Sequence, residues 1–119
     1  MSFLRSRAKS FSYAFKGLAF VLQTQHNARI HLVAALIVIA LGLFAGLGAN
    51  EWLWLLSAIT LVWFAETMNT AFEYLCDVVQ PEFHASVGRA KDIAAGAVLI
   101  TAIYAVIVGC LILVPALLA

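Results

Sequence analysis

The sequence contains very little charge. Of its 119 residues, seven are Lys or Arg and six are Asp or Glu, while 65% are hydrophobic and the mean hydropathy is +1.02. A soluble globule needs more polar surface than these residues can supply. The composition therefore excludes a soluble domain and indicates an integral membrane protein. With about 20 apolar residues in each spanning helix, residues 1–119 have room for about three spans and a surface segment in one small domain.

Cysteine is also scarce, and it belongs to no metal-binding pattern. Cys76 and Cys110 fall at opposite ends of their apolar segments, which places them at opposite membrane faces and excludes a disulfide within one subunit. The chain has neither CxxC nor a Cys/His cluster. Its histidines, His26, His31 and His84, lack a ligand spacing such as HExxH, so we expect structural or hydrogen-bonding roles for them.

The familiar nucleotide-binding signatures are missing as well. The chain has no GxxxxGK[ST] loop and no HRD or DFG sequence, which excludes P-loop NTPases and the usual protein kinases. A net charge of +1 gives no reason to expect a nucleic-acid partner. Any phosphate chemistry must therefore rest on a different arrangement of side chains.

The basic residues lie on one side of the predicted membrane. Five precede the first span and two lie between the second and third, whereas the turn at residues 46–51 has none: Arg5, Arg7, Lys9, Lys16, Arg29, Arg89 and Lys91. Because Lys and Arg favour cytoplasmic loops, this distribution predicts a cytoplasmic N-terminus and an external C-terminus. A cleavable signal peptide is not expected, since the first apolar run begins only after Arg29 and lacks a small-residue cleavage site.

The predicted fold is an all-α membrane bundle with an amphipathic surface helix. Residues 3–22 keep an apolar stripe at helical spacing with basic residues beside it, which suits an anionic lipid surface. Packing of this helix on the bundle is the alternative. Apolar runs predict spans at about 32–48, 52–77 with a cytoplasmic extension, and 93–113. Gly42 and Gly46 form a GxxxG pair, a helix-packing pattern that is also common by chance in membrane helices.

The most polar run of the N-terminal half, QTQHNARIH at residues 23–31, directly precedes the first span. It has two interpretations. It is either the solvated start of a helix or a cytoplasmic rim that contacts a phosphate through Arg29 or the side-chain amides. The residues alone leave both open.

Three carboxylates and an amide gather on one stripe of the second span. At about 100° per residue, Glu66, Asn69, Glu73 and Asp77 fall within an arc of roughly 80°. The preceding segment, residues 52–65, carries no charge. A span that starts at residue 52 therefore places Glu66 within the bilayer, near the interface opposite to the one where the span starts. An ionisable group at that depth is costly unless it faces a protein interior or a wet cavity. The acidic stripe is therefore the candidate functional site.

These residue types suit phosphoryl transfer onto a hydroxyl at the membrane surface. A poorly solvated Glu66 is a good proton acceptor and fits a general base. Glu73 and Asp77 could hold Mg²⁺ through oxygen ligands completed by phosphate and water. Arg89 and Lys91 could neutralise phosphate charge. They belong to a cluster that begins the third helix: Gly88, Arg89, Lys91 and Asp92.

Two other classes of protein compete with this interpretation. A proton- or ion-conducting bundle also places carboxylates within the membrane. The cluster of Arg89, Lys91 and Asp92 favours phosphate handling over conduction. A small structural membrane subunit is the third possibility, and it would leave the acidic stripe unexplained.

Two segments resemble the signature of a known family. AETMNTAFEYLCDVV, followed by FHASVGRAKDIAAGAVLI, is similar to the small prokaryotic integral-membrane lipid kinases, which include diacylglycerol kinase and undecaprenol kinase. FKGL at residues 15–18 and NARIH at residues 27–31 match the N-terminal part of that family. The resemblance implies a homotrimer of three-span subunits in the bacterial inner membrane. It also implies that MgATP phosphorylates a lipid alcohol at active sites shared between neighbouring subunits.

The resemblance also implies roles for single residues. Glu66 matches the proposed catalytic base, Asn69 its hydrogen-bonding companion and Glu73 a metal ligand. The residues that match the nucleotide site are Lys16 in FKGL, Asp77, Gly88, Arg89, Lys91 and Asp92. Gln25 stands where the family usually has a second metal-binding glutamate, which puts that contact in doubt. NARIH, Glu51–Trp52 and AAGAVL resemble the undecaprenol kinase branch and GRAKD the diacylglycerol kinase branch, and on balance undecaprenol is favoured.

Overall fold

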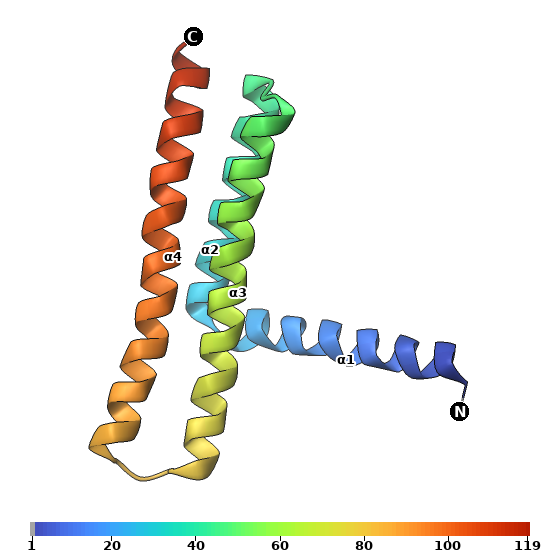
Figure 1. Ribbon diagram of the computed structural model, residues 1–119, viewed down its shortest axis with the longest axis vertical. Helices are drawn as coiled ribbons and strands as arrows, with labels where there is room; N and C mark the ends of the chain where they lie inside the picture. The colour runs from blue at the N-terminus through green and yellow to red at the C-terminus, as the bar shows by residue number, and fades with distance from the viewer. Residues whose placement is uncertain (1) are drawn as a thin grey trace.

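The computed structural model describes residues 2–119, and the regular structure in that range is entirely helical. In chain order the helices are α1 (Phe3–Thr24), α2 (His26–Ala45), α3 (Ala49–Val79) and α4 (Ala85–Leu118). In Figure 1 α2, α3 and α4 lie side by side, and α1 projects from their flank. By length and composition, α2, α3 and α4 can each cross a membrane. The predicted fold class, an all-α membrane protein with an N-terminal helix beside three spans, is confirmed.

The N-terminal helix α1 keeps most of its apolar side chains exposed. Ser2 caps its start by accepting a hydrogen bond from the backbone N–H of Arg5 at 3.2 Å. Phe3, Leu4 and Phe11 lie open, and Val21 near the other end is the buried residue of the helix. Only the C-terminal half of α1 therefore meets the bundle. Such exposure favours a helix on the membrane surface over one packed along the bundle.

Arg29 fixes the elbow between α1 and α2. Its guanidinium donates to the carbonyl oxygens of Leu22 at 2.9 Å and Gln23 at 2.6 Å. These carbonyls belong to the last turn of α1, where helix geometry leaves them without partners, and a basic side chain satisfies them well. The Arg29 guanidinium is thus bound to backbone carbonyls of α1, which favours a structural role over a phosphate contact.

The GxxxG pair shapes the turn between α2 and α3. Gly46 ends α2 in the left-handed region at φ 67°, and the N–H of Leu47 donates to the carbonyl of Gly42 at 3.3 Å. Gly42 itself faces Trp52, whose Cη2 would lie 2.7 Å from a Cβ at that position. Close approach therefore occurs within one chain, between α2 and the first turn of α3.

The core lies mainly between α3 and α4. It centres on Leu55, Ala58, Val108 and Leu113, with Tyr104 packed against them. The α3 helix ends at Val79, just before Gln80 and Pro81. The α4 helix continues past Pro115 to its last turn. It can do so because a proline there removes a single backbone donor near the helix end.

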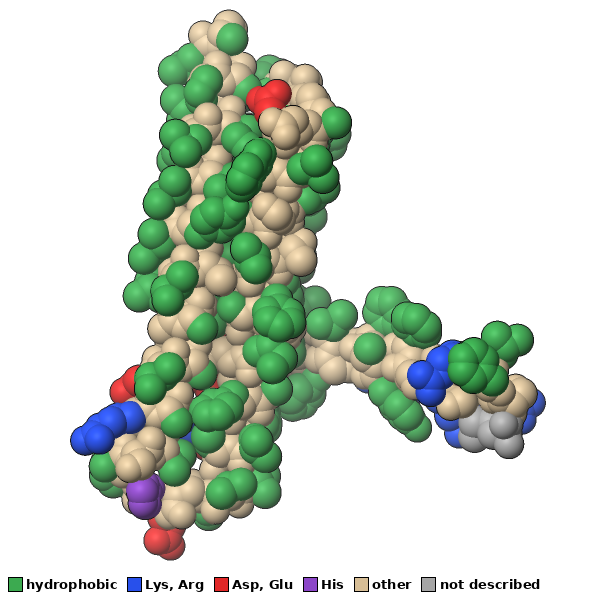
Figure 2. Space-filling view, in the orientation of Figure 1, with side chains coloured by type: hydrophobic (Ala, Val, Ile, Leu, Met, Phe, Trp, Pro, Cys, Tyr) green, Lys and Arg blue, Asp and Glu red, His purple; other side chains and the backbone are tan. Residues whose placement is uncertain are grey.

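Both α3 and α4 are longer than a bilayer requires. The 34 residues of α4 correspond to about 51 Å, against a hydrocarbon core of about 30 Å. In Figure 1 these helices continue beyond the level of α1 to the α3–α4 connection, and Figure 2 shows charged side chains gathered at that end. We call residues 66–92 the polar half of the bundle, and residues 42–65 with 93–118 the apolar half. The chain is a multi-pass membrane protein.

Candidate active site

The acidic stripe lies on α3 close to the level where α1 joins the bundle. The rings of Phe20 and Tyr74 pack with centroids 5.3 Å apart, and Leu18 and Val21 of α1 share a pocket with Thr70. Because α1 carries the features of a surface helix, this contact sets the depth of the stripe. Glu66 lies about 12 Å along the helix axis from Tyr74 and is the deepest of its carboxylates.

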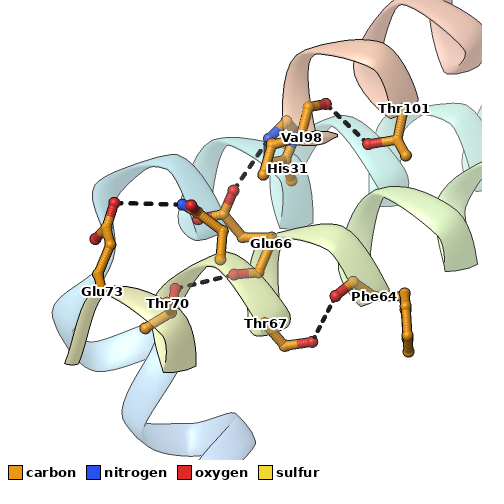
Figure 3. Close-up of polar contacts among 9 residues, drawn as sticks. His31, Phe64, Glu66, Thr67, Thr70, Glu73, Val98 and Thr101 are labelled. Carbon is orange, nitrogen blue, oxygen red and sulfur yellow. Dashed lines mark hydrogen bonds and ion pairs between the residues drawn. The ribbon is translucent and has the colours of Figure 1, made fainter. Parts of the chain in front are cut away.

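Glu66 is almost fully enclosed. The residue is 2% exposed, and its Oε2 is buried without a hydrogen-bond partner in the described chain. A chargeable neighbour is His31 of α2, whose Nε2 lies 3.8 Å from Oε2. Thr70, one turn along α3, donates its hydroxyl to the backbone carbonyl of Glu66 at 3.0 Å rather than to the carboxylate. Figure 3 shows His31 approaching Glu66 from the neighbouring helix.

Asn69 and Glu73 form the next level of the stripe. The amide of Asn69 donates to Oε1 of Glu73 at 3.4 Å, while its own Oδ1 is buried without a partner among residues 2–119. Buried polar atoms are nearly always hydrogen-bonded in folded proteins. Glu66 Oε2 and Asn69 Oδ1, on neighbouring turns, therefore mark a place where a hydrogen-bond donor or a cation would satisfy them.

Asp77 links the stripe to α4. Its Oδ1 accepts a hydrogen bond from the ammonium of Lys91, and both side chains reach solvent, at 61% and 35% exposure. Lys91 precedes the apolar run that starts at Ile93, so it lies outside the hydrocarbon region. The hydrogen bond to Asp77 raises the pKa of Lys91, and the ammonium therefore stays charged at neutral pH. The pair brings together two residues that are 14 positions apart.

Five further candidates stay apart from the stripe within one chain: Lys16, Gln25, Gly88, Arg89 and Asp92. The Lys16 ammonium lies 5.8 Å from the ring centroid of Tyr13 on the exposed surface of α1. Gln25, at the break between α1 and α2, donates its amide to Thr24 Oγ1 at 3.3 Å. Arg89 and Asp92 are exposed on α4. Between residues 2 and 119, no side-chain hydrogen bond or ion pair joins any of the five to the stripe.

The stripe fits Mg²⁺ bound together with a nucleotide better than a metal held by protein alone. No group of three or more His, Cys, Asp or Glu in the described residues could hold an ion by itself. Mg²⁺ usually takes one or two carboxylates and completes its shell with phosphate oxygens and water. Glu73 is a carboxylate of this kind, and the unpartnered Oδ1 of Asn69 is a neighbouring oxygen that could ligate the metal.

The sequence pattern did not single out His31. It predicted only a structural or hydrogen-bonding role for the three histidines, without a partner. His31 is the last polar residue before an apolar run, and this position is the sequence signal that could have pointed to it. Its partner could not be predicted, because that contact depends on how α2 packs on α3.

Comparison with known proteins shows which family the chain resembles over most of its length. The profile described as "Prokaryotic diacylglycerol kinase" matches residues 12–113. An undecaprenol kinase from Bacillus subtilis is 35% identical over 107 residues, covering 90% of this chain and 87% of that protein. A diacylglycerol kinase from Synechocystis is 43% identical over 108 residues, covering 89% and 62%.

A diacylglycerol kinase from Escherichia coli K12 is 34% identical over 105 residues, covering 88% of this chain and 86% of that protein. The match therefore spans the acidic stripe, the α3–α4 connection and most of each helix. It also agrees with the motif resemblance found in the sequence. The chain belongs to the prokaryotic diacylglycerol kinase family, a family of membrane lipid kinases.

Proposed function

We propose that this protein transfers a phosphoryl group from ATP to the hydroxyl of a membrane lipid, with Glu66 as the general base. The observation that carries the proposal is the Glu66 carboxylate, which is almost fully enclosed and has no side-chain hydrogen bond in the described chain. A carboxylate without hydrogen-bond donors can accept the proton of a hydroxyl that reaches it. The kinase relatives supply the reaction class.

Each residue of the stripe then has a distinct task. Glu66 accepts the proton of the lipid hydroxyl while the hydroxyl oxygen bonds to the γ-phosphorus, and the bond from that phosphorus to the bridging oxygen of ADP breaks. Asn69 orients the reacting groups through its free Oδ1. Glu73 would hold Mg²⁺, which would neutralise phosphate charge when bound. Lys91, fixed by Asp77, contacts the phosphates.

An apolar cavity beside the site suits the hydrocarbon part of a lipid. It has a volume of about 510 Å³ and lies between α2, α3 and α4. His31 lines it, and most of the other lining side chains are small or aliphatic, including Ala35, Leu55, Ala58 and Ala105. A lipid chain placed there would bring its headgroup toward Glu66, because His31 contacts both the cavity and the carboxylate.

The test is a phosphorylation assay with two lipids in parallel. The purified protein in mixed micelles receives MgATP with either undecaprenol or diacylglycerol, and transfer of the γ-phosphate to lipid is measured. We expect phosphorylation of both classes to be detectable and undecaprenol to be preferred. Failure to phosphorylate any lipid alcohol would reject the proposal. The conducting bundle draws no support from the relatives compared, which are all kinases.

The proposal also includes the orientation and the assembly. With seven basic residues at one face, the polar half and the N-terminus lie in the cytoplasm, where ATP is available. A reporter fused after Ala119 that is active only in the cytoplasm should therefore be silent. The resemblance implies a homotrimer, which mass measurement of the detergent-solubilised complex would test. Strong reporter activity or a monomeric mass would overturn these two parts separately.

A further inference from the structure

The enclosed carboxylate of Glu66 depends on another helix for a polar partner. On α3 itself, the Thr70 hydroxyl donates to a backbone carbonyl and the Asn69 amide donates to Glu73. Neither of these donors is therefore available to the Glu66 carboxylate. In the described residues, His31 supplies the polar group that faces Oε2, at 3.8 Å.

The distance from Nε2 of His31 to Oε2 of Glu66 is slightly longer than a hydrogen bond. Catalytic contacts are often long before substrate binds and shorten in the reacting complex. A shift of about 0.6–0.9 Å would bring these two atoms within hydrogen-bond distance. The side chain of His31 is 21% exposed and that of Glu66 is 3% exposed, and His31 lines the apolar cavity whereas Glu66 does not.

We infer that His31 is a positioning residue, which donates its Nε2–H to Oε2 of Glu66 and leaves Oε1 to accept the proton of the lipid hydroxyl. This inference rests on the proposed role of Glu66 as the base. A carboxylate free to rotate would present its lone pairs to the hydroxyl for only part of the time. A donor on α2 that holds one carboxylate oxygen in place raises the fraction of productive geometries. A reacting group misplaced by about 1 Å can lower the rate about 100-fold.

The first experiment compares variants that keep or remove the donor. His31→Leu removes the N–H, whereas His31→Gln places an amide N–H close to the position of Nε2. We expect His31→Leu to lower kcat by about 10- to 100-fold with the KM for MgATP nearly unchanged, and His31→Gln to recover most of that loss. His26→Leu is the matched control on the same helix and should retain the wild-type kcat. His26 is exposed and has no side-chain hydrogen bond or ion pair within residues 2–119.

A double-mutant cycle separates positioning from independent effects. If His31 acts through Glu66, His31→Leu should not lower the residual rate of Glu66→Gln further. An equal fold-loss in both backgrounds would overturn the inference, as would a wild-type kcat for His31→Leu. A His31→Gln variant as inactive as His31→Leu would make His31 a proton acceptor in its own right, which also contradicts a positioning role.

A second measurement does not require activity. The ¹⁵N signals of the His31 ring, recorded without substrate, should change between wild type and Glu66→Gln, while those of His26 and His84 should not. An unchanged His31 signal would remove the contact on which the inference depends, even if the variants fold poorly. If the wild type phosphorylates no lipid but the His31 signal responds, the proposed function fails and the contact stands.

Discussion

The apolar and polar halves of the bundle treat their polar atoms differently. In the apolar half, the hydroxyls of Ser57, Thr60 and Thr101 donate to carbonyls of their own helices at 2.7–2.8 Å, so their hydrogen bonds are satisfied within one turn. In the polar half, Glu66 and Asn69 each keep a buried oxygen without a donor in the described chain. The first arrangement needs nothing from outside, whereas the second is incomplete.

Their apolar packing differs in the same sense. Leu55 and Ala58, at 2% and 1% exposure, pack in the core against Val108, and the ring of Trp52 lies on Gly42 without room for a side chain there. In the polar half the buried set includes Glu66 and Thr70, each 2% exposed. Burying a carboxylate costs free energy that packing does not return. Under the proposed function, stability and chemistry therefore depend on separate lengths of the same helix.

The largest expected effect comes from removing the base. Glu66→Gln keeps the shape of the side chain but cannot accept a proton, so kcat should fall by about 10²- to 10⁴-fold while nucleotide binding survives. The measurements are kcat and an independent ATP-binding titration. Turnover near the wild-type value would show that the buried carboxylate has another purpose.

A second change in the polar half should act on binding rather than on turnover alone. Glu73→Gln removes a charged oxygen ligand for Mg²⁺, so the KM for MgATP should rise, by about tenfold or more. The control is Glu51→Gln in the apolar half, where Glu51 accepts from the N–H of Gly48 at 3.3 Å and lies far along α3 from the stripe. A loss of kcat in Glu73→Gln at unchanged KM would contradict the metal assignment.

In the apolar half the sensitive position is Gly42. An added methyl would overlap the Trp52 ring, with 2.7 Å to Cη2 and 3.0 Å to Cζ2. Gly42→Ala should therefore destabilise the bundle, by about 1–3 kcal/mol, with a lower Tm in micelles and a kcat close to wild type at low temperature. Gly96→Ala is the control, because a Cβ there meets nothing within 4 Å. Equal stability of the two variants would mean that Trp52 moves aside freely.

Periodicity and hydropathy predicted the all-α fold, the surface helix and the acidic stripe, because these depend on residues close together in sequence. The same patterns could not predict contacts between helices. Three such contacts depend on how the helices turn and pack. Trp52 packs on Gly42, Arg29 donates to the carbonyl of Leu22, and His31 lies near Glu66. The resemblance grouped Asp77 and Lys91 at the nucleotide site, but no pattern predicted that these two side chains form an ion pair with each other.

The smallest expected effect concerns Gln25, where the family usually has a glutamate. Gln25 lies at the break between α1 and α2, and its amide donates to Thr24 Oγ1 at 3.3 Å. A Gln carbonyl can ligate Mg²⁺ but adds no formal charge, so the site should hold its metal more weakly than a relative with glutamate. Gln25→Glu should therefore lower the Mg²⁺ concentration needed for half-maximal activity, with little change in the KM for lipid.

The gain should be modest, because a carboxylate that shares the metal with Glu73 must be desolvated and repels that residue when metal is absent. We expect a shift of about two- to fivefold in a Mg²⁺ titration at saturating ATP, corresponding to roughly 0.4–1 kcal/mol. Gln23→Glu, on the exposed last turn of α1, adds the same charge nearby and serves as the control. If both variants shift the curve equally, general charge near the polar half is responsible. If Gln25→Glu leaves the curve unchanged, residue 25 does not reach the metal, and Glu73 with Lys91 and Asp92 holds the nucleotide without it.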